Sequence, residues 1–103
     1  MYGVVTTVLA PVEMYDRMHA ELIKRAGTSV EGMGLLVHVG RATADGFERF
    51  EVWESKEHYD RAMKVSDSLS RELAGDLPQP STEKSTEVFD VRGIVIPQGN
   101  IVI

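Results

Sequence analysis

The sequence predicts an α+β domain whose elements follow the order β-α-β-β-α-β. Three observations predict it. A strand-like segment opens the chain and passes into a helical pattern at Pro11, two strand patterns flank a turn at residues 43–46, and a strand becomes a helix directly at Ser55. Right-handed crossovers in this order place both helices on one face of a four-stranded antiparallel sheet.

The opening strand is expected at residues 2–9, which are rich in β-branched side chains and end before Ala10 and Pro11. Pro11 suits the first turn of a helix, because the N–H that proline lacks is not needed there. Apolar side chains then recur at helical spacing in the order Tyr15, Met18, Leu22 and Ala26. Gly27 is the expected C-terminal stop of this helix.

A central hairpin is expected to join a strand at 35–41 to a strand at about 47–54. The connecting residues 43–46, Thr-Ala-Asp-Gly, have the chemistry of a turn. Strict alternation places one aliphatic row on the side of the helices, namely Leu35, Val37 and Val39. The opposite face is then expected to carry Leu36 and His38, together with some of Arg49, Glu51 and Trp53. A slip of one residue at the turn would present Phe50 and Val52 there instead.

The second helix is expected at 56–74, where Ser55 can accept a hydrogen bond from a free amide and Glu57 favours the positive end of the helix dipole. After a polar loop at 75–85, residues 86–96 form the fourth strand, interrupted at Gly93. The order of elements is the ferredoxin-like one. The domain is therefore expected to span 1–96, and residues 97–103 to form a tail that contacts a dimer partner or covers a sheet edge.

The composition bounds the classes of function. With 103 residues the chain is one domain, and its net charge of −5 argues against nucleic acid or an anionic membrane as the main partner. There is no cysteine, which excludes disulfides and thiolate chemistry and fits a reducing compartment. No signal-peptide pattern and no apolar run near the ~20 residues of a membrane span are visible. We therefore expect a cytoplasmic protein.

The sheet face without helices is predicted to be an assembly surface. It combines apolar side chains such as Leu36 with polar ones such as His38. It is therefore too apolar to remain exposed to water and too polar to be part of an ordinary core. A second copy packed sheet to sheet would enclose it as a lined cavity. The fold class expected is thus a ferredoxin-like domain paired as a homodimeric α/β barrel.

Two segments, GLLVH at 34–38 and DGFERFEVWESKEHYDRA at 45–62, resemble the dimeric α/β-barrel superfamily, and in particular its antibiotic-biosynthesis-monooxygenase-like group. The most specific piece is the G-x(5)-V-W-E-S element, Gly46 through Ser55. The resemblance covers roughly 4–95. It implies a homodimeric barrel; some members oxidise polyphenolic substrates without metal or added cofactor, and others degrade haem.

The residues that haem-degrading members use are only partly matched. The resemblance implies an asparagine on the first strand, a tryptophan, and a histidine that binds iron from a helix. This chain has Thr6 and Thr7 on that strand, Trp53 as a match by type, and His58 in the first turn of the second helix. The asparagine of the cofactor-independent oxygenases is also missing, since Asn100 in the tail is the sole asparagine. No cofactor is therefore expected.

His38 is the leading catalytic candidate. It lies mid-strand between two valines, where an imidazole can act as a general base on a phenol or enol. The alternative is a structural histidine that pairs with a cross-strand residue, for which Glu51 is best placed. Trp53 is expected to stack on a planar ligand, with core packing as the alternative. The remaining ligand-binding candidates, for which an interfacial ion pair or ordinary packing is the alternative, are Arg49, Glu51, Leu36 and Arg92.

The sequence favours no metal site, because His19, His38 and His58 have no ligand spacing in common. The function expected is that of a small homodimer of the monooxygenase-like group that binds a small, planar, apolar or aromatic ligand in its cavity, with cofactor-independent oxygenase activity on the same site. Two alternatives stay open. One is a non-catalytic ligand-binding or accessory protein, which gains if His38 is held in an ion pair. The other is a polyketide-type cyclase or isomerase in which His38 moves a proton.

Overall fold

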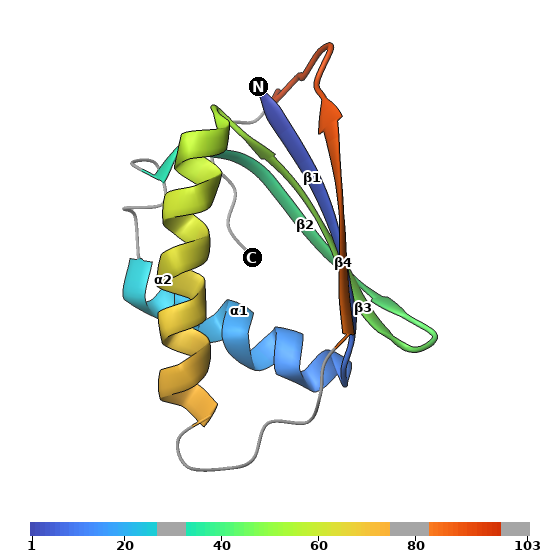
Figure 1. The fold of residues 1–103 in the computed structure, drawn as a ribbon, viewed down its shortest axis with the longest axis vertical. Coiled ribbons are helices and arrows are strands. Elements are labelled where there is room, and N and C mark those ends of the chain that lie inside the picture. The colour runs from blue at the N-terminus through green and yellow to red at the C-terminus, as the bar shows by residue number, and fades with distance from the viewer. Residues whose placement is uncertain (27–32, 75–82, 98–103) are drawn as a thin grey trace.

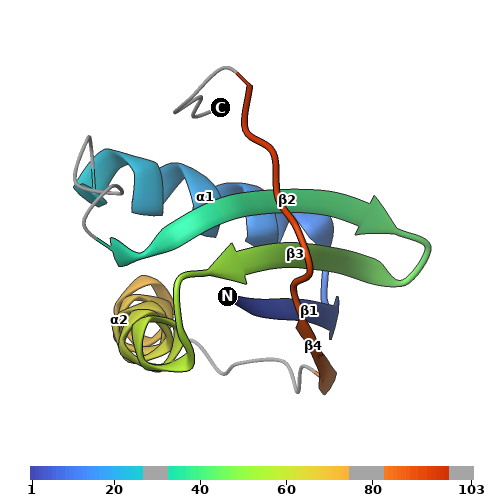
Figure 2. The same ribbon diagram turned by 90° about the horizontal axis from the view of Figure 1, so that it is seen from above.

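The computed structural model describes residues 1–26, 33–74 and 83–97 (Figure 1). Its elements confirm the predicted order: β1 (Tyr2–Leu9), α1 (Val12–Ala26), β2 (Leu35–Thr43), β3 (Gly46–Trp53), α2 (Lys56–Ala74) and β4 (Glu83–Asp90). The sheet has the strand order β2-β3-β1-β4, and all neighbouring strands are antiparallel. Both helices lie on one side of the sheet, and Figure 2 shows them from above. The ferredoxin-like fold is therefore confirmed.

The junction between β3 and α2 has the predicted cap. The backbone N–H of His58 donates to Ser55 Oγ at 3.3 Å, and the N–H of Tyr59 donates to the Ser55 carbonyl at 3.2 Å. Ser55 thus satisfies a first-turn amide that has no partner within the helix. The expected stop at Gly27 and the tail after Pro97 lie outside the described residues.

The fourth strand differs from the predicted 86–96. β4 pairs with β1 from Tyr2↔Asp90 to Leu9↔Glu83, so the strand starts and ends earlier. The physical reason is the partner strand: β1 begins at Tyr2 and offers no backbone groups to residues beyond Asp90. Residues 91–97 instead leave the sheet and pass over its end (Figure 2).

The core lies between the sheet and the helices in two clusters. One cluster centres on Val4, Trp53 and Ala62, with Tyr59 and Met63 of α2 packed against it. The other centres on Val8, Ala10 and Phe47, with residues of α1 such as Tyr15 packed against it. Even-numbered residues of β1 and odd-numbered residues of β3 therefore face the helices.

The predicted face assignment of β2 was wrong after its first residue, and a bulge is the reason. Leu35 pairs with Trp53, but Val37 pairs with Val52, so Leu36 is an extra residue in β2. One extra residue moves every later side chain to the opposite face. Leu35 faces the helices as predicted, but Val37 and Val39 do not. His38 pairs with Glu51 and faces the helices with it.

The sheet face opposite the helices, which we call the open face, has an apolar part around Phe50 and polar side chains beside it, such as Glu48 and Glu87. Phe50 and Phe89 stack there with ring centroids 5.5 Å apart, and Val39 is 54% exposed. Gly3 allows this stack because a Cβ at that position would overlap the Phe89 ring. The register places six apolar side chains on the open face, namely Val5, Val37, Val39, Phe50, Val52 and Phe89.

In the described ranges, neither helix is long and apolar enough to cross a membrane.

Candidate functional site

Three titratable side chains form a hydrogen-bonded chain between α1 and the sheet. The Tyr15 hydroxyl lies 2.8 Å from His38 Nε2, and His38 Nδ1 lies 2.9 Å from Glu51 Oε2. Each comes from a different element: α1, β2 and β3. Glu51 is buried, and Tyr15 and His38 are half-buried. The pairing of His38 with Glu51 confirms the predicted cross-strand neighbour.

The partners fix the direction of these hydrogen bonds. An ionised carboxylate can only accept, so His38 donates from Nδ1 to Glu51. In the neutral ring Nε2 then has a lone pair, so the Tyr15 hydroxyl donates to it. We call this Tyr15–His38–Glu51 arrangement the relay, because each proton in it points toward the buried carboxylate.

Gly40 makes room for the tyrosine. A Cβ on Gly40 would overlap the hydroxyl end of the Tyr15 ring, so this end lies directly against the backbone of β2. The ring is also 6.0 Å from that of His38 and 5.3 Å from that of His19, nearly parallel to both. The Tyr15 hydroxyl lies 3.5 Å from His19 Nδ1 as well. Tyr15 was not a candidate in the sequence, where it counts as an apolar helix position.

Arg49 brings a positive charge beside the relay. Its Nε lies 3.7 Å from Glu51 Oε1, and its Nη2 donates weakly to the Met63 sulfur at 3.6 Å. A separation of 3.7 Å allows charge attraction but is too long for a hydrogen bond. Arg49 and Glu51 therefore form a buried ion pair, but Arg49 Nε and Glu51 Oε1 are not hydrogen-bonded to each other.

Four buried polar atoms on the helix-facing side of the sheet have no hydrogen-bond partner within the described part of the chain. They are Thr6 Oγ1, Arg49 Nε, Glu51 Oε1 and Trp53 Nε1. Thr6 is fully buried and pairs directly with Arg49 across the strands. Because an unsatisfied buried polar atom costs about 1–3 kcal/mol, four of them on one face are an unusual concentration.

The other sequence candidates are placed differently. Trp53 is only 2% exposed and belongs to the core, in contact with Tyr59 at 5.9 Å between ring centroids. The Trp53 ring is thus packed in the core, which was the alternative to stacking on a ligand. Its Nε1 is one of the four buried atoms without a hydrogen-bond partner. Leu36 is the bulge residue. The Arg92 side chain is 92% exposed beyond β4, beside Asp90, and is not brought to the cluster.

His58 is held at the start of α2. Its Nδ1 lies 2.6 Å from Ser55 Oγ, and its Nε2 lies 3.5 Å from a carboxylate oxygen of Glu54. Both ring nitrogens are therefore engaged by neighbours in the chain. His58 does not present a nitrogen in the manner that an iron ligand requires.

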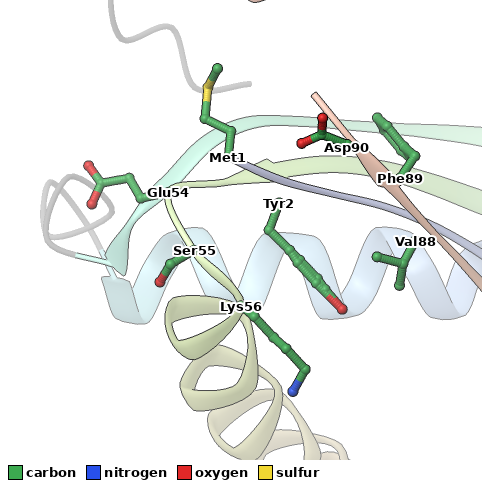
Figure 3. Close-up of a pocket in the computed structure, with 8 residues that line it drawn as sticks. All are labelled: Met1, Tyr2, Glu54, Ser55, Lys56, Val88, Phe89 and Asp90. Carbon is green, nitrogen blue, oxygen red and sulfur yellow. The ribbon is translucent and has the colours of Figure 1, made fainter. Parts of the chain in front are cut away.

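An open pocket of about 640 Å³ lies at the end of the sheet next to the start of α2 (Figure 3). Tyr2 and Val88 point toward the helix side in this view, and Met1 and Phe89 point the other way. Val88 on the helix side of β4 is 56% exposed, so the helices leave this part of the sheet uncovered. The pocket shares no residue with the relay, but Tyr2 stacks on Tyr59, which contacts Trp53.

Burial raises the pKa of the Tyr15 hydroxyl above its ordinary value of 10.0, with further contributions from Glu51 and Asp16 that outweigh Arg49. The unfolded chain then releases this proton at lower pH than the folded chain. The stabilisation from Tyr15 is complete below about pH 10 and is lost as the pH rises through the folded-state pKa.

We therefore expect the free energy of unfolding to fall between about pH 9 and pH 11, and to fall less steeply in Tyr15→Phe. Urea unfolding at a series of pH values measures both slopes. Tyr59, whose pKa is also raised mainly by burial, remains in both proteins and accounts for residual loss. Parallel slopes for the two proteins would contradict the expectation.

No family model matches this sequence, and no curated protein matches it. Solved structures with the same fold were found. A dimeric ferredoxin-like protein from an uncultured marine organism is 13% identical, with a TM-score of 0.60 over 92% of this chain and 96% of that one. A mutant of MhuD with two manganese protoporphyrin IX molecules bound per active site is 17% identical, with a TM-score of 0.58 over 92% and 98%.

A third structure is a candidate antibiotic biosynthesis monooxygenase from Deinococcus radiodurans. It is 12% identical, with a TM-score of 0.56 over 96% of this chain and 100% of that one. At such identities the likeness shows the fold alone. The chain has the ferredoxin-like fold of these proteins, and the resemblance to the monooxygenase-like group is confirmed at the level of the fold.

Proposed function

We propose that this protein is a homodimeric ligand-binding protein with the monooxygenase-like fold, and that each copy binds a small planar ligand between its helices and its sheet. The observation that carries the proposal is the group of four buried, unpartnered polar atoms on the helix-facing side. A ligand that reaches them gains hydrogen bonds for which the protein has already lost solvation.

The polar atoms define what the ligand must offer. Arg49 Nε is a donor, the Thr6 hydroxyl opposite it can donate, and Glu51 Oε1 is an acceptor one pair further along β3. A ligand with a carbonyl oxygen beside a hydroxyl group matches this set. The rest of the surroundings is aromatic or apolar, which suits a planar ring system.

The proposed location differs from the predicted cavity. The sequence placed the ligand inside the barrel, between the sheets of two copies. Because the bulge at Leu36 turns His38 toward the helices, the polar cluster belongs to the inside of one copy. The open face is left with apolar side chains and fits a second copy of the chain.

The state of His38 favours binding over direct catalysis by this residue. Both of its ring nitrogens are engaged, by Glu51 and by Tyr15, so neither faces a ligand. The hydrogen bond to Glu51 is the feature that distinguishes the binding protein from an enzyme that uses His38 as a free base. No cofactor is assigned to the cluster.

The experiment uses Trp53, the one tryptophan of the chain, as an internal reporter. We expect 1-hydroxy-2-acetonaphthone, which carries a hydroxyl beside a carbonyl, to quench its fluorescence in a saturable manner. The matched hydrocarbon 2-ethylnaphthalene should bind at least ~10-fold more weakly, because it leaves the polar atoms unpaired. Arg49→Met should remove most of this preference.

Equal binding of the two naphthalenes, or an absence of saturable quenching, would contradict the proposed site. Oxygen consumption during the titration would change the assignment to the cofactor-independent oxygenase that the resemblance implies.

A further inference from the structure

We propose that the relay gives this protein an activity, the redox-neutral transfer of a proton from the carbon next to a ligand carbonyl, with Tyr15 as the catalytic residue. The inference rests on the proposed ligand site. It names the reaction for which that site is built: enolisation of a ketone attached to or fused with a planar aromatic ring.

The register brings the relay and the unpartnered donors into neighbouring rows of the sheet. Gly40, Arg49 and Thr6 form one row across β2, β3 and β1, and Tyr15 lies over its Gly40 end. His38 and Glu51 form part of the next row. In the proposed complex, Arg49 and Thr6 hold the ligand carbonyl, and the adjacent carbon lies on the side of the Tyr15 hydroxyl.

The hydrogen-bond directions make Tyr15, and not His38, the group that meets the ligand. Its O–H proton already points at His38 Nε2, and its oxygen keeps lone pairs that can accept a proton. His38 points its other proton at the buried carboxylate of Glu51. His38 and Glu51 act through Tyr15 and are positioning residues.

The proposed step is balanced without an oxidant or a reductant. The C–H bond next to the carbonyl breaks, and its proton forms an O–H bond on Tyr15, while the former Tyr15 proton passes to His38 Nε2. His38 becomes an imidazolium that the Glu51 carboxylate stabilises. The C–H electron pair forms the carbon–carbon double bond of the enolate, and the π pair of the C=O bond moves onto the oxygen, where Arg49 and Thr6 hold the negative charge. The reverse transfer returns a proton to carbon or to oxygen.

The test is exchange of the acidic C–H protons of 2-tetralone with deuterium oxide, followed by proton NMR with the full-length protein. We expect the protein to accelerate exchange over buffer, and Tyr15→Phe to lower this acceleration at least ~100-fold, in the range of general acid–base contributions. The phenylalanine keeps the ring contacts with His19, His38 and Phe47.

Tyr59→Phe is the matched control, because Tyr59 is a second half-buried tyrosine on the helix side and its hydroxyl is not in the relay. It should stay within about threefold of the wild type.

Binding is measured in parallel by Trp53 quenching, which separates the two proposals. Binding of 2-tetralone by the wild type without accelerated exchange would overturn the relay and leave the ligand site standing. Equal exchange rates for wild type and Tyr15→Phe, with binding retained, would also overturn it. Failure of both 2-tetralone and the hydroxynaphthone to bind would contradict the proposed function itself, and the relay with it.

Discussion

Arg49→Leu is expected to lower the free energy of unfolding by about 3 kcal/mol, because it leaves the Glu51 carboxylate buried without its cation. Removing one partner of a buried ion pair typically costs ~3–5 kcal/mol. The lower end applies here, since Arg49 Nε and Glu51 Oε1 are 3.7 Å apart and the Arg49 side chain keeps 19% exposure. Urea unfolding at one fixed protein concentration measures the change, because the proposed dimer would make stability depend on concentration.

The double variant Arg49→Leu with Glu51→Leu should behave differently. It removes both charges and two of the unpartnered buried atoms, Arg49 Nε and Glu51 Oε1. We expect it to be more stable than Arg49→Leu alone, because no uncompensated charge stays buried. It should not reach the wild type, since His38 Nδ1 loses the acceptor that Glu51 Oε2 supplies at 2.9 Å, at a cost of about 1–3 kcal/mol. The same variant should lose ligand binding.

A surface pair supplies the control. Lys56 donates to Asp60 at 2.7 Å on α2 and both side chains are well exposed, so Lys56→Leu should change the free energy of unfolding by less than about 1 kcal/mol. Strictly additive losses in the Arg49 and Glu51 variants would count against coupling between these two residues.

Much of the fold could be predicted because its elements are specified locally. The turn at 43–46, the cap at Ser55 and the periodicity of α2 each depend on neighbours in sequence, and all three have the predicted form. The limits of β4 could not be predicted in this way. They depend on where β1 begins, which is a property of the partner strand.

The face of His38 could not be predicted, because the sequence around the bulge is ambiguous. Leu35, Leu36 and Val37 are all apolar, so either phase of the strand buries an apolar side chain and no polar residue marks the extra position. Glu51 was nevertheless identified as the partner of His38, since the turn fixes the register beyond the bulge.

Tyr15 was missed because its role depends on a contact 23 residues away in sequence. At its own position it fits the apolar stripe of α1. The signal that could have found it is Gly40, a glycine inside a strand, which often marks the close approach of another group. The sequence shows that position 40 has no side chain, but it does not identify the residue that occupies the space beside it.

Phe50→Asp is expected to convert the proposed dimer into a folded monomer. Phe50 lies in the middle of the open face, is 40% exposed in one copy, and stacks on Phe89. Fully burying a phenylalanine contributes ~1.5–3 kcal/mol, and the dimer would bury the 40% of Phe50 that one copy leaves exposed. A two-fold axis buries this part twice, about 1.2–2.4 kcal/mol, so losing it should weaken the dimer roughly 10-fold or more. The aspartate adds a charge that would have to be desolvated in the interface. Sedimentation velocity over a range of protein concentrations measures the change, and circular dichroism checks that the variant is folded.

The matched control is Val65→Asp, which places the same charge at a 58% exposed apolar position on α2, away from the open face. If Phe50→Asp sediments as a dimer alongside this control, the sheet-to-sheet assembly is wrong. A monomeric wild type at the same concentrations would contradict it equally.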